Sequence, residues 1–137
     1  MKIYAVIDTN VLVSAMLKWS SVPGTIIEFA FRGIIIPVLN DKIVKEYRSV
    51  LLRERFHLTS DIVDDVIRAL EEQGEFIDPE HINITLPDPD DAIFYEVVME
   101  KRKTNDSFLV TGNIKHFPNQ PFIVTPRELL EIIIEQQ

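Results

Sequence analysis

The chain has 137 residues, 46% of them hydrophobic, which is enough to build the core of one compact domain spanning residues 1–137. It contains no cysteine, so disulfides, thiolate metal sites and cysteine nucleophiles are excluded. The net charge of −8 argues against a uniformly basic surface for nucleic acid.

The first part of the chain alternates apolar strands with helical segments. Ile3–Ile7 is apolar without alternation, which predicts a central parallel strand that is covered on both faces. Helices are expected from Val11 to Leu17 and from Pro23 to Phe31, because Pro suits the first helical turn and Gly33 follows the second helix. Another buried strand is expected over residues 34–38.

The middle of the chain predicts three helices and one short strand. Asn40 is placed to cap a helix that runs to about residue 55, and the next helix runs from Ser60 or Asp61 to Gln73. A short strand is expected around residues 83–85. The segment Asp88-Pro89-Asp90-Asp91 has the composition of a helix start, and this helix extends to about residue 102.

The last part of the chain adds two strands and a closing helix. Residues 107–110 are expected to form a strand that ends at Thr111-Gly112-Asn113, and residues 122–124 form the final strand. Thr125-Pro126 starts the closing helix. Its core or interface candidates are Leu129, Leu130, Ile133 and Ile134.

This order of elements predicts an α/β fold. Strands that alternate with helices along the whole length form a mostly parallel sheet, here of four to five strands, between two layers of helices. In such sheets ligands bind at the carboxyl ends of the strands. The polar residues that follow the strands are therefore the places to search for chemistry.

Charge is segregated along the chain. Residues 61–100 hold 13 acidic side chains and one arginine, whereas the remainder has a net positive charge. The basic residues outside this acidic region form two clusters: Lys42, Lys45, Arg48, Arg53 and Arg55, and Lys101, Arg102, Lys103 and Lys115. Each cluster alone is explained as a solvated helix face, although a modest basic surface for nucleic acid is compatible with the sequence.

The apolar runs are too short to cross a bilayer, and the first residues lack a basic stretch followed by a long apolar segment. The absence of cysteine suits a reducing compartment. We therefore expect a cytoplasmic protein with no membrane partner.

Four acidic residues are candidates for a functional site. Asp8 ends the first strand, where it either caps the next helix or faces the crevice above the sheet. Asp88 and Asp91 are also explained by an N-cap and by favourable charge at a helix start. Glu46 lies on or beside the apolar stripe of its helix, where it is either a partly desolvated acid or a boundary residue paired with a nearby base.

Together these acids suggest a metal site. Asp8, Glu46 and Asp91 are each expected at the carboxyl edge of the sheet or on a helix that leans over it. Clustered carboxylates repel one another and protonate unless a cation offsets their charge. Mg²⁺ and Mn²⁺ prefer oxygen ligands and bind substrate phosphates, so the cluster points to phosphodiester chemistry.

At these residues the sequence resembles the PIN-domain family, particularly its branch of bacterial toxin components from toxin–antitoxin systems. The resemblance spans essentially the whole chain. It rests on four motifs in order: Asp8-Thr9-Asn10-Val11, Lys45-Glu46-Tyr47, Asp88-Pro89-Asp90-Asp91-Ala92 and Val110-Thr111-Gly112-Asn113. The resemblance implies an endoribonuclease that uses Mg²⁺ or Mn²⁺ to cleave single-stranded RNA, an antitoxin protein as partner, and a homodimer.

By the same resemblance, Asp8, Glu46 and Asp91 match the first three family acids, with Asp88 as an additional ligand. We expect Asp8 and Asp91 to ligate the metal ion directly and Glu46 to act through water. Asn113 departs from the family pattern, which has an acid after Thr-Gly in many members. Its amide oxygen is still a ligand candidate, but it adds no negative charge.

Several neighbouring polar residues are weaker candidates. Asn10 is expected to orient Asp8 by a hydrogen bond, Thr111 to contact metal-bound water or phosphate, and Lys115 to contact phosphate. His116 suggests acid–base chemistry and Trp19 a stacking platform, but a turn histidine and a packing tryptophan are the simpler interpretations.

Two alternative functions stay open. A degenerate PIN module would bind RNA or an antitoxin without cleaving, which Asn113 makes plausible. A phosphotransfer enzyme with Asp8 as nucleophile would form an aspartyl phosphate. Such enzymes commonly carry a second acid two residues later, where this chain has Asn10.

Overall fold

A parallel five-stranded sheet forms the centre of the computed structural model, which describes residues 2–136. The strand order is β3-β2-β1-β4-β5, and all four pairings are parallel. The strands are β1 (Ile3–Ile7), β2 (Ile35–Leu39), β3 (Glu75–Phe76), β4 (Ser107–Val110) and β5 (Ile123–Val124). The expected mostly parallel sheet is confirmed.

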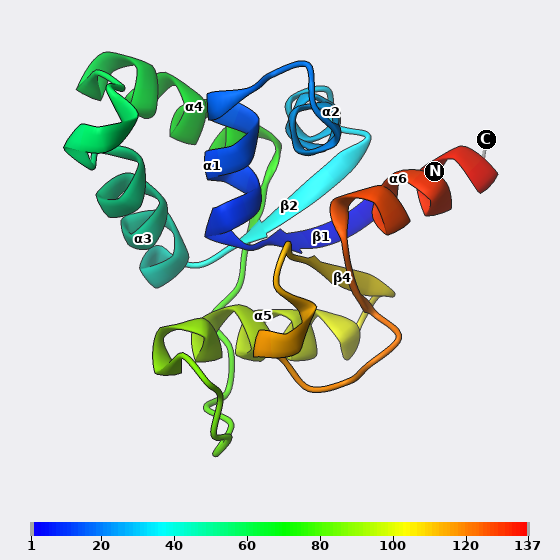
Figure 1. The fold of residues 1–137 in the computed structure, drawn as a ribbon. Coiled ribbons are helices and arrows are strands. Elements are labelled where there is room, and N and C mark those ends of the chain that lie inside the picture. Colours follow the sequence, from blue (N-terminus) through cyan, green and yellow to red (C-terminus); the bar gives the residue numbers. More distant parts are fainter. Residues whose placement is uncertain (1, 137) are drawn as a thin grey trace.

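Helices cover both faces of this sheet. The helix α5 lies against one face, and α1, α2 and α4 lie on the other side (Figure 1). The closing helix α6 packs against α2. The helices are α1 (Thr9–Leu17), α2 (Val22–Phe31), α3 (Asp41–Leu51), α4 (Ser60–Gln73), α5 (Ala92–Arg102) and α6 (Pro126–Glu135).

The central strand is apolar throughout because both of its faces are covered. Ala5 and Val6 are fully buried, and Ile7 is nearly so. Burying each large apolar side chain of this kind contributes about 1.5–3 kcal/mol relative to leaving it exposed. The unalternating pattern of β1 is therefore explained by its place in the middle of the sheet.

Local capping sets the starts of several helices. The Asn40 side chain accepts a hydrogen bond from the Lys42 backbone N–H at 2.8 Å, as its position in the sequence predicts. Thr125 and Glu128 form a reciprocal capping box at the start of α6. Pro126 follows Thr125 in the first turn, where its missing N–H has no helical partner to lose.

Two sequence predictions about the elements were wrong, and one strand was not predicted. No strand forms at residues 83–85, and residues 77–86 have no regular structure. In this segment the Ile82 N–H donates to the Glu96 carboxylate at 2.7 Å and not to a neighbouring strand. The sheet is instead extended by β3, directly after α4. The helix α3 ends at Leu51 and not near residue 55, and a short 3-10 helix, η1 (Glu54–Phe56), follows it.

Two smaller differences concern helix positions. The first helix begins at Thr9, two residues before the predicted start. In α6, Leu129 and Ile133 are buried, whereas Ile134 is 60% exposed and does not belong to the core. Within residues 2–136, no helix has both the length and the apolar character that spanning a membrane requires.

Gly74 provides a test of the packing between α4 and the sheet. A Cβ atom at this position would lie 2.7 Å from Leu39 Cδ1 and 2.8 Å from the Leu70 carbonyl oxygen. We expect Gly74→Ala to lower the free energy of unfolding by about 1–3 kcal/mol, because a backbone carbonyl yields little space. Urea denaturation measures this decrease.

Gly112→Ala is the matched control. A Cβ atom there would lie 3.5 Å from the nearest heavy atom, an ordinary contact. We expect this variant to stay within about 0.5 kcal/mol of the parent protein. Equal stability of the Gly74→Ala and parent proteins would contradict the packing described here.

Candidate functional site

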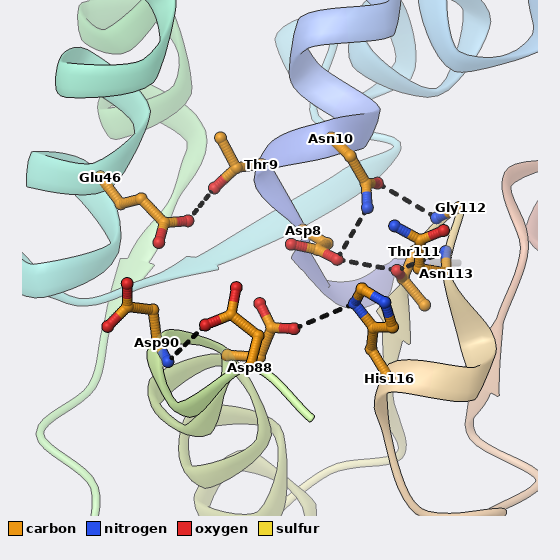
Figure 2. A network of polar contacts seen from close by, with 11 residues as sticks. Asp8, Thr9, Asn10, Glu46, Asp88, Asp90, Thr111, Gly112, Asn113 and His116 are labelled. Atoms are coloured by element: carbon orange, nitrogen blue, oxygen red, sulfur yellow. Dashed lines mark hydrogen bonds and ion pairs between the residues drawn. The ribbon is translucent and has the colours of Figure 1, made fainter. Parts of the chain in front are cut away.

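A cavity of about 390 Å³ opens at the carboxyl edge of the sheet. Its walls come from the end of β1, the start of α1, one side of α3, the start of α5 and the segment after β4. The acidic side chains of this wall are Asp8, Glu46, Asp88, Asp90 and Asp91. Figure 2 shows that the Asp8, Glu46 and Asp88 side chains point toward a common space. The three acids predicted to converge, Asp8, Glu46 and Asp91, all line this cavity.

Asp8 is held at the end of β1 by several contacts. Its backbone N–H donates to the Val110 carbonyl at 2.9 Å, which continues the pairing of β1 with β4. Its Oδ2 accepts from the Thr111 hydroxyl at 2.7 Å and from the Asn10 amide at 3.1 Å. Asp8 makes no side-chain cap bond to α1, so it faces the cavity.

The residues around Asp8 form a continuous hydrogen-bond network (Figure 2). Asn10 also accepts from the Gly112 N–H at 3.1 Å, and the Thr111 hydroxyl accepts from the Asn113 N–H at 3.0 Å. The predicted hydrogen bond between Asn10 and Asp8 is therefore present, and Asn10 joins α1 to the segment after β4. This network fixes the direction of the Asp8 carboxylate.

Glu46 reaches the cavity from α3. It is half-buried and accepts a hydrogen bond from the Thr9 hydroxyl. Among residues 2–136, Glu46 forms no ion pair with Lys42 or Arg53, so the simple surface pairing considered for it is not found.

The neighbouring Tyr47 places α3 relative to the sheet. It is buried, and its hydroxyl donates to the Ile7 carbonyl at 2.5 Å. Its ring packs near Phe94, which is also buried. This contact ties the helix that carries Glu46 to the last residue of β1.

The acids at the start of α5 have different roles in the structure. Asp88 accepts from the Asp90 N–H at 3.0 Å and caps the short 3-10 helix η2 (Pro89–Asp91), as the local pattern suggests. Asp91 is buried and makes no cap bond. Its Oδ2 lies 3.5 Å from His116 Nδ1.

Burial raises the pKa of all three predicted acids, and neighbouring carboxylates raise the pKa of Glu46 and Asp91 further. Burial raises the pKa of Asp8, which the hydrogen bond from Thr111 partly opposes. Burial also raises the pKa of Glu46, with further contributions from Asp8 and other acids, and the Thr9 hydrogen bond opposes it. Burial and then the Asp8 charge raise the pKa of Asp91 to about 6. The charged form of each carboxyl group is therefore less favourable in this cavity than in water.

The donor chemistry of the cavity fits a hard divalent cation. Its oxygen-rich, negatively charged wall is the kind of site that Mg²⁺ and Mn²⁺ prefer. In the part of the chain that the structure describes, however, no group of three His, Cys, Asp or Glu side chains is arranged to hold a metal ion. The match between this cavity and a divalent cation is therefore one of charge and ligand type, and not of ligand geometry.

Some of the weaker site candidates line the cavity and others do not. Asn113 and His116 line the cavity, although nothing in the local sequence distinguished His116 from a surface turn residue. Lys115 is exposed and does not line this cavity. Trp19 stacks on Phe31 with ring centroids 5.8 Å apart and is also outside the cavity lining, which agrees with a packing role.

Further lining residues were not predicted as part of the site. Asp90 adds an exposed carboxylate. Arg53, Arg55 and Phe56 form another part of the wall, beyond the end of α3. The two arginines belonged to a basic cluster in the sequence, but only the fold shows that they lie beside the acids.

A family model described as PIN domain matches residues 4–115 of the chain. The matched region contains all the acidic residues of the cavity and Asn113. Comparison with curated proteins and with solved structures gave no match.

Asp91 makes the stability of the protein dependent on pH. Between its usual pKa of 3.8 and the raised value of about 6, the folded state binds more protons at Asp91 than the unfolded state does. Its contribution to stability therefore falls as pH rises through this window. We expect Asp91→Asn to raise Tm by a few degrees at neutral pH and to have little effect near pH 4.

Thermal denaturation in EDTA at both pH values tests this expectation. Asp90→Asn is the matched control, because it removes an exposed carboxylate from the same 3-10 helix. A Tm gain that is equal at both pH values would show that the effect of Asp91→Asn does not come from its ionisation.

Proposed function

Because the chain belongs to the PIN-domain family, whose members are generally nucleases, we propose that it is a metal-dependent endoribonuclease that cleaves single-stranded RNA. The observation that carries this proposal is the meeting of Asp8, Glu46 and Asp91 in one cavity at the carboxyl edge of the sheet. These residues are far apart in sequence; burial raises the pKa of all three, and neighbouring carboxylates add to the effect at Glu46 and Asp91.

In this proposal, Asp8 and Asp91 hold a divalent ion directly, and Glu46 and Asp88 complete its negative surroundings. Asn113 would supply a neutral amide oxygen. When bound, Mg²⁺ or Mn²⁺ lowers the pKa of water and stabilises charge on the scissile phosphate. Thr111 and Asn10 keep the Asp8 carboxylate in a fixed direction, so little reorganisation is needed.

The hydrogen-bond partners of the acids contribute to the proposed reaction. The Thr9 hydroxyl fixes one oxygen of Glu46, which leaves this carboxylate suited to orient a water molecule. His116 lies beside Asp91, with its Nδ1 3.5 Å from Asp91 Oδ2, where the protonated imidazole would offset part of the repulsion among the acids. A cavity is reached more readily by an unpaired strand than by a duplex, which supports a single-stranded substrate.

A degenerate module that binds RNA or a partner protein without cleavage is the second candidate. Two observations favour it: Asn113 adds no charge, and no three acidic or histidine side chains within residues 2–136 are arranged around a common ion. Binding without metal-dependent cleavage would support this candidate.

The role as a cytoplasmic toxin is also part of the proposal and rests on the resemblance of the four motifs. It implies an antitoxin protein that blocks the cavity, and a homodimer is compatible with it. Growth arrest on expression of the parent protein, relieved by Asp8→Asn, would support a toxic nuclease. Continued growth despite cleavage activity in vitro would contradict the toxin role.

The central test is cleavage of a labelled single-stranded RNA in Mg²⁺ or Mn²⁺. We expect EDTA to abolish cleavage and Asp8→Asn to reduce its rate by roughly two to three orders of magnitude, the scale of losing one preorganised group at a charged transition state. Asp65→Asn, the same change at an exposed residue of α4, is the control.

Metal binding is measured separately by thermal denaturation. Mn²⁺ should raise Tm of the parent protein in a concentration-dependent manner, because a ligand that binds the folded state stabilises it. Asp8→Asn should lose most of this increase. Cleavage that persists in EDTA, or in Asp8→Asn, would contradict the proposed chemistry.

A further inference from the structure

We propose that Arg53 and Arg55, the latter supported by Phe56, bind the backbone phosphates of a nucleic-acid strand beside the acidic cavity; these three residues are here called the arginine rim. This inference rests on the proposed function, because it assigns the part of the wall that holds the strand next to the cleaved bond. All three residues line the cavity that contains Asp8 and Glu46.

The path of the chain places Arg53 on the same side of α3 as Glu46. Glu46, Val50 and Arg53 are separated by four and three residues, which is the spacing of one helix face, and all three line the cavity. Arg53 lies two residues after the end of α3, where its backbone N–H still binds the Val50 carbonyl. The helix therefore presents an acid, and the segment just after it a base about two turns further along, to the same space.

The two arginines of the rim have no acidic partner. Within residues 2–136, neither Arg53 nor Arg55 forms an ion pair or a side-chain hydrogen bond, whereas Arg32, Arg48 and Arg68 each pair with a nearby acid. Both arginines are exposed, and in the described part of the chain neither pairs with any of the carboxylates that line the same cavity. Their guanidinium donors are thus available to an anion, and phosphate matches their geometry.

Phe56 supports Arg55. The Arg55 guanidinium carbon lies 4.8 Å from the centroid of the Phe56 ring, within the range of a cation–π contact. The ring is half-buried, and the 3-10 helix η1 that carries both residues is followed by His57, whose φ of 54° lies in the left-handed region. Both side chains line the cavity, so the contact with the ring holds the Arg55 charge at its wall.

The combination defines a class of substrate. The acidic cavity would receive the phosphate that is cleaved, while the arginine rim needs at least one further phosphate on the same strand. A polynucleotide that extends past the cleaved bond meets this requirement, and a mononucleotide does not. Contacts between arginines and phosphates do not read the bases directly, so we expect the arginine rim to bind with little base preference. Because these contacts are electrostatic, binding should weaken as the salt concentration rises.

Fluorescence anisotropy tests the rim in the absence of cleavage. The probe is a labelled single-stranded oligoribonucleotide of mixed sequence, titrated with Asp8→Asn protein in Mg²⁺ at several salt concentrations. We expect the added substitutions Arg53→Gln and Arg55→Gln to weaken binding at least about tenfold. The slope of log K against log salt should become shallower by roughly 0.7 for each phosphate that an arginine no longer neutralises.

Arg32→Gln in the same Asp8→Asn background is the matched control. It removes one arginine charge by the same substitution, as each single rim variant does, but Arg32 lies after α2, before the amino end of β2, and so at the opposite edge of the sheet. We expect its affinity and salt slope to equal those of the background. Phe56→Leu should weaken binding as much as Arg55→Gln alone does, because it removes the support for that guanidinium.

The outcomes separate this inference from the proposed nuclease function. Unchanged affinity and salt slope in the double arginine variant would contradict the proposed role of the arginine rim. A background protein that does not bind the oligonucleotide would also contradict it. An unchanged affinity in Phe56→Leu would overturn the role given to the ring. Binding through the rim without cleavage by the parent protein would leave the rim intact and contradict the nuclease. Circular dichroism melts confirm that each variant is folded.

Discussion

Repulsion among carboxylates in one partly buried cavity is the constraint on which the rest of this site depends. Burial raises the pKa of Asp8, Glu46 and Asp91, and neighbouring carboxylates raise that of Glu46 and Asp91 further, so the protein gains stability if it takes up protons or a cation there. Thr111 and Thr9 donate hydrogen bonds that keep two of these acids in place. The fold thus keeps carboxylates close together at a cost in stability, and a bound cation would reduce that cost.

The topology of the sheet explains where this arrangement occurs. The chain builds β1, β2 and β3 in one direction and then adds β4 and β5 on the other side of β1. The carboxyl edge beside β1 is therefore the point where strand order reverses, and crevices for ligands form at such points. Asp8 and Thr111 follow the two strands that meet there, while Tyr47 ties α3 to the same edge.

Much of the fold follows from the sequence alone. The unalternating run of β1 indicated a strand covered on both faces, and caps such as Asn40 and Thr125 marked helix starts, because these signals act within a few residues. The order of strands and helices then allowed little except a parallel sheet between helices. From this geometry alone, the acids after β1 and at the start of α5 were expected at one edge.

The tertiary structure decided what depends on contacts between distant residues. Residues 83–85 have a strand-like pattern, yet the Glu96 carboxylate takes the Ile82 N–H. Asn10 and Gly112 are joined across 102 positions, and no local signal specifies such a contact. The same holds for His116 beside Asp91 and for Arg53 on the cavity wall, because a side chain on a turn becomes part of a site only when another element is packed against it.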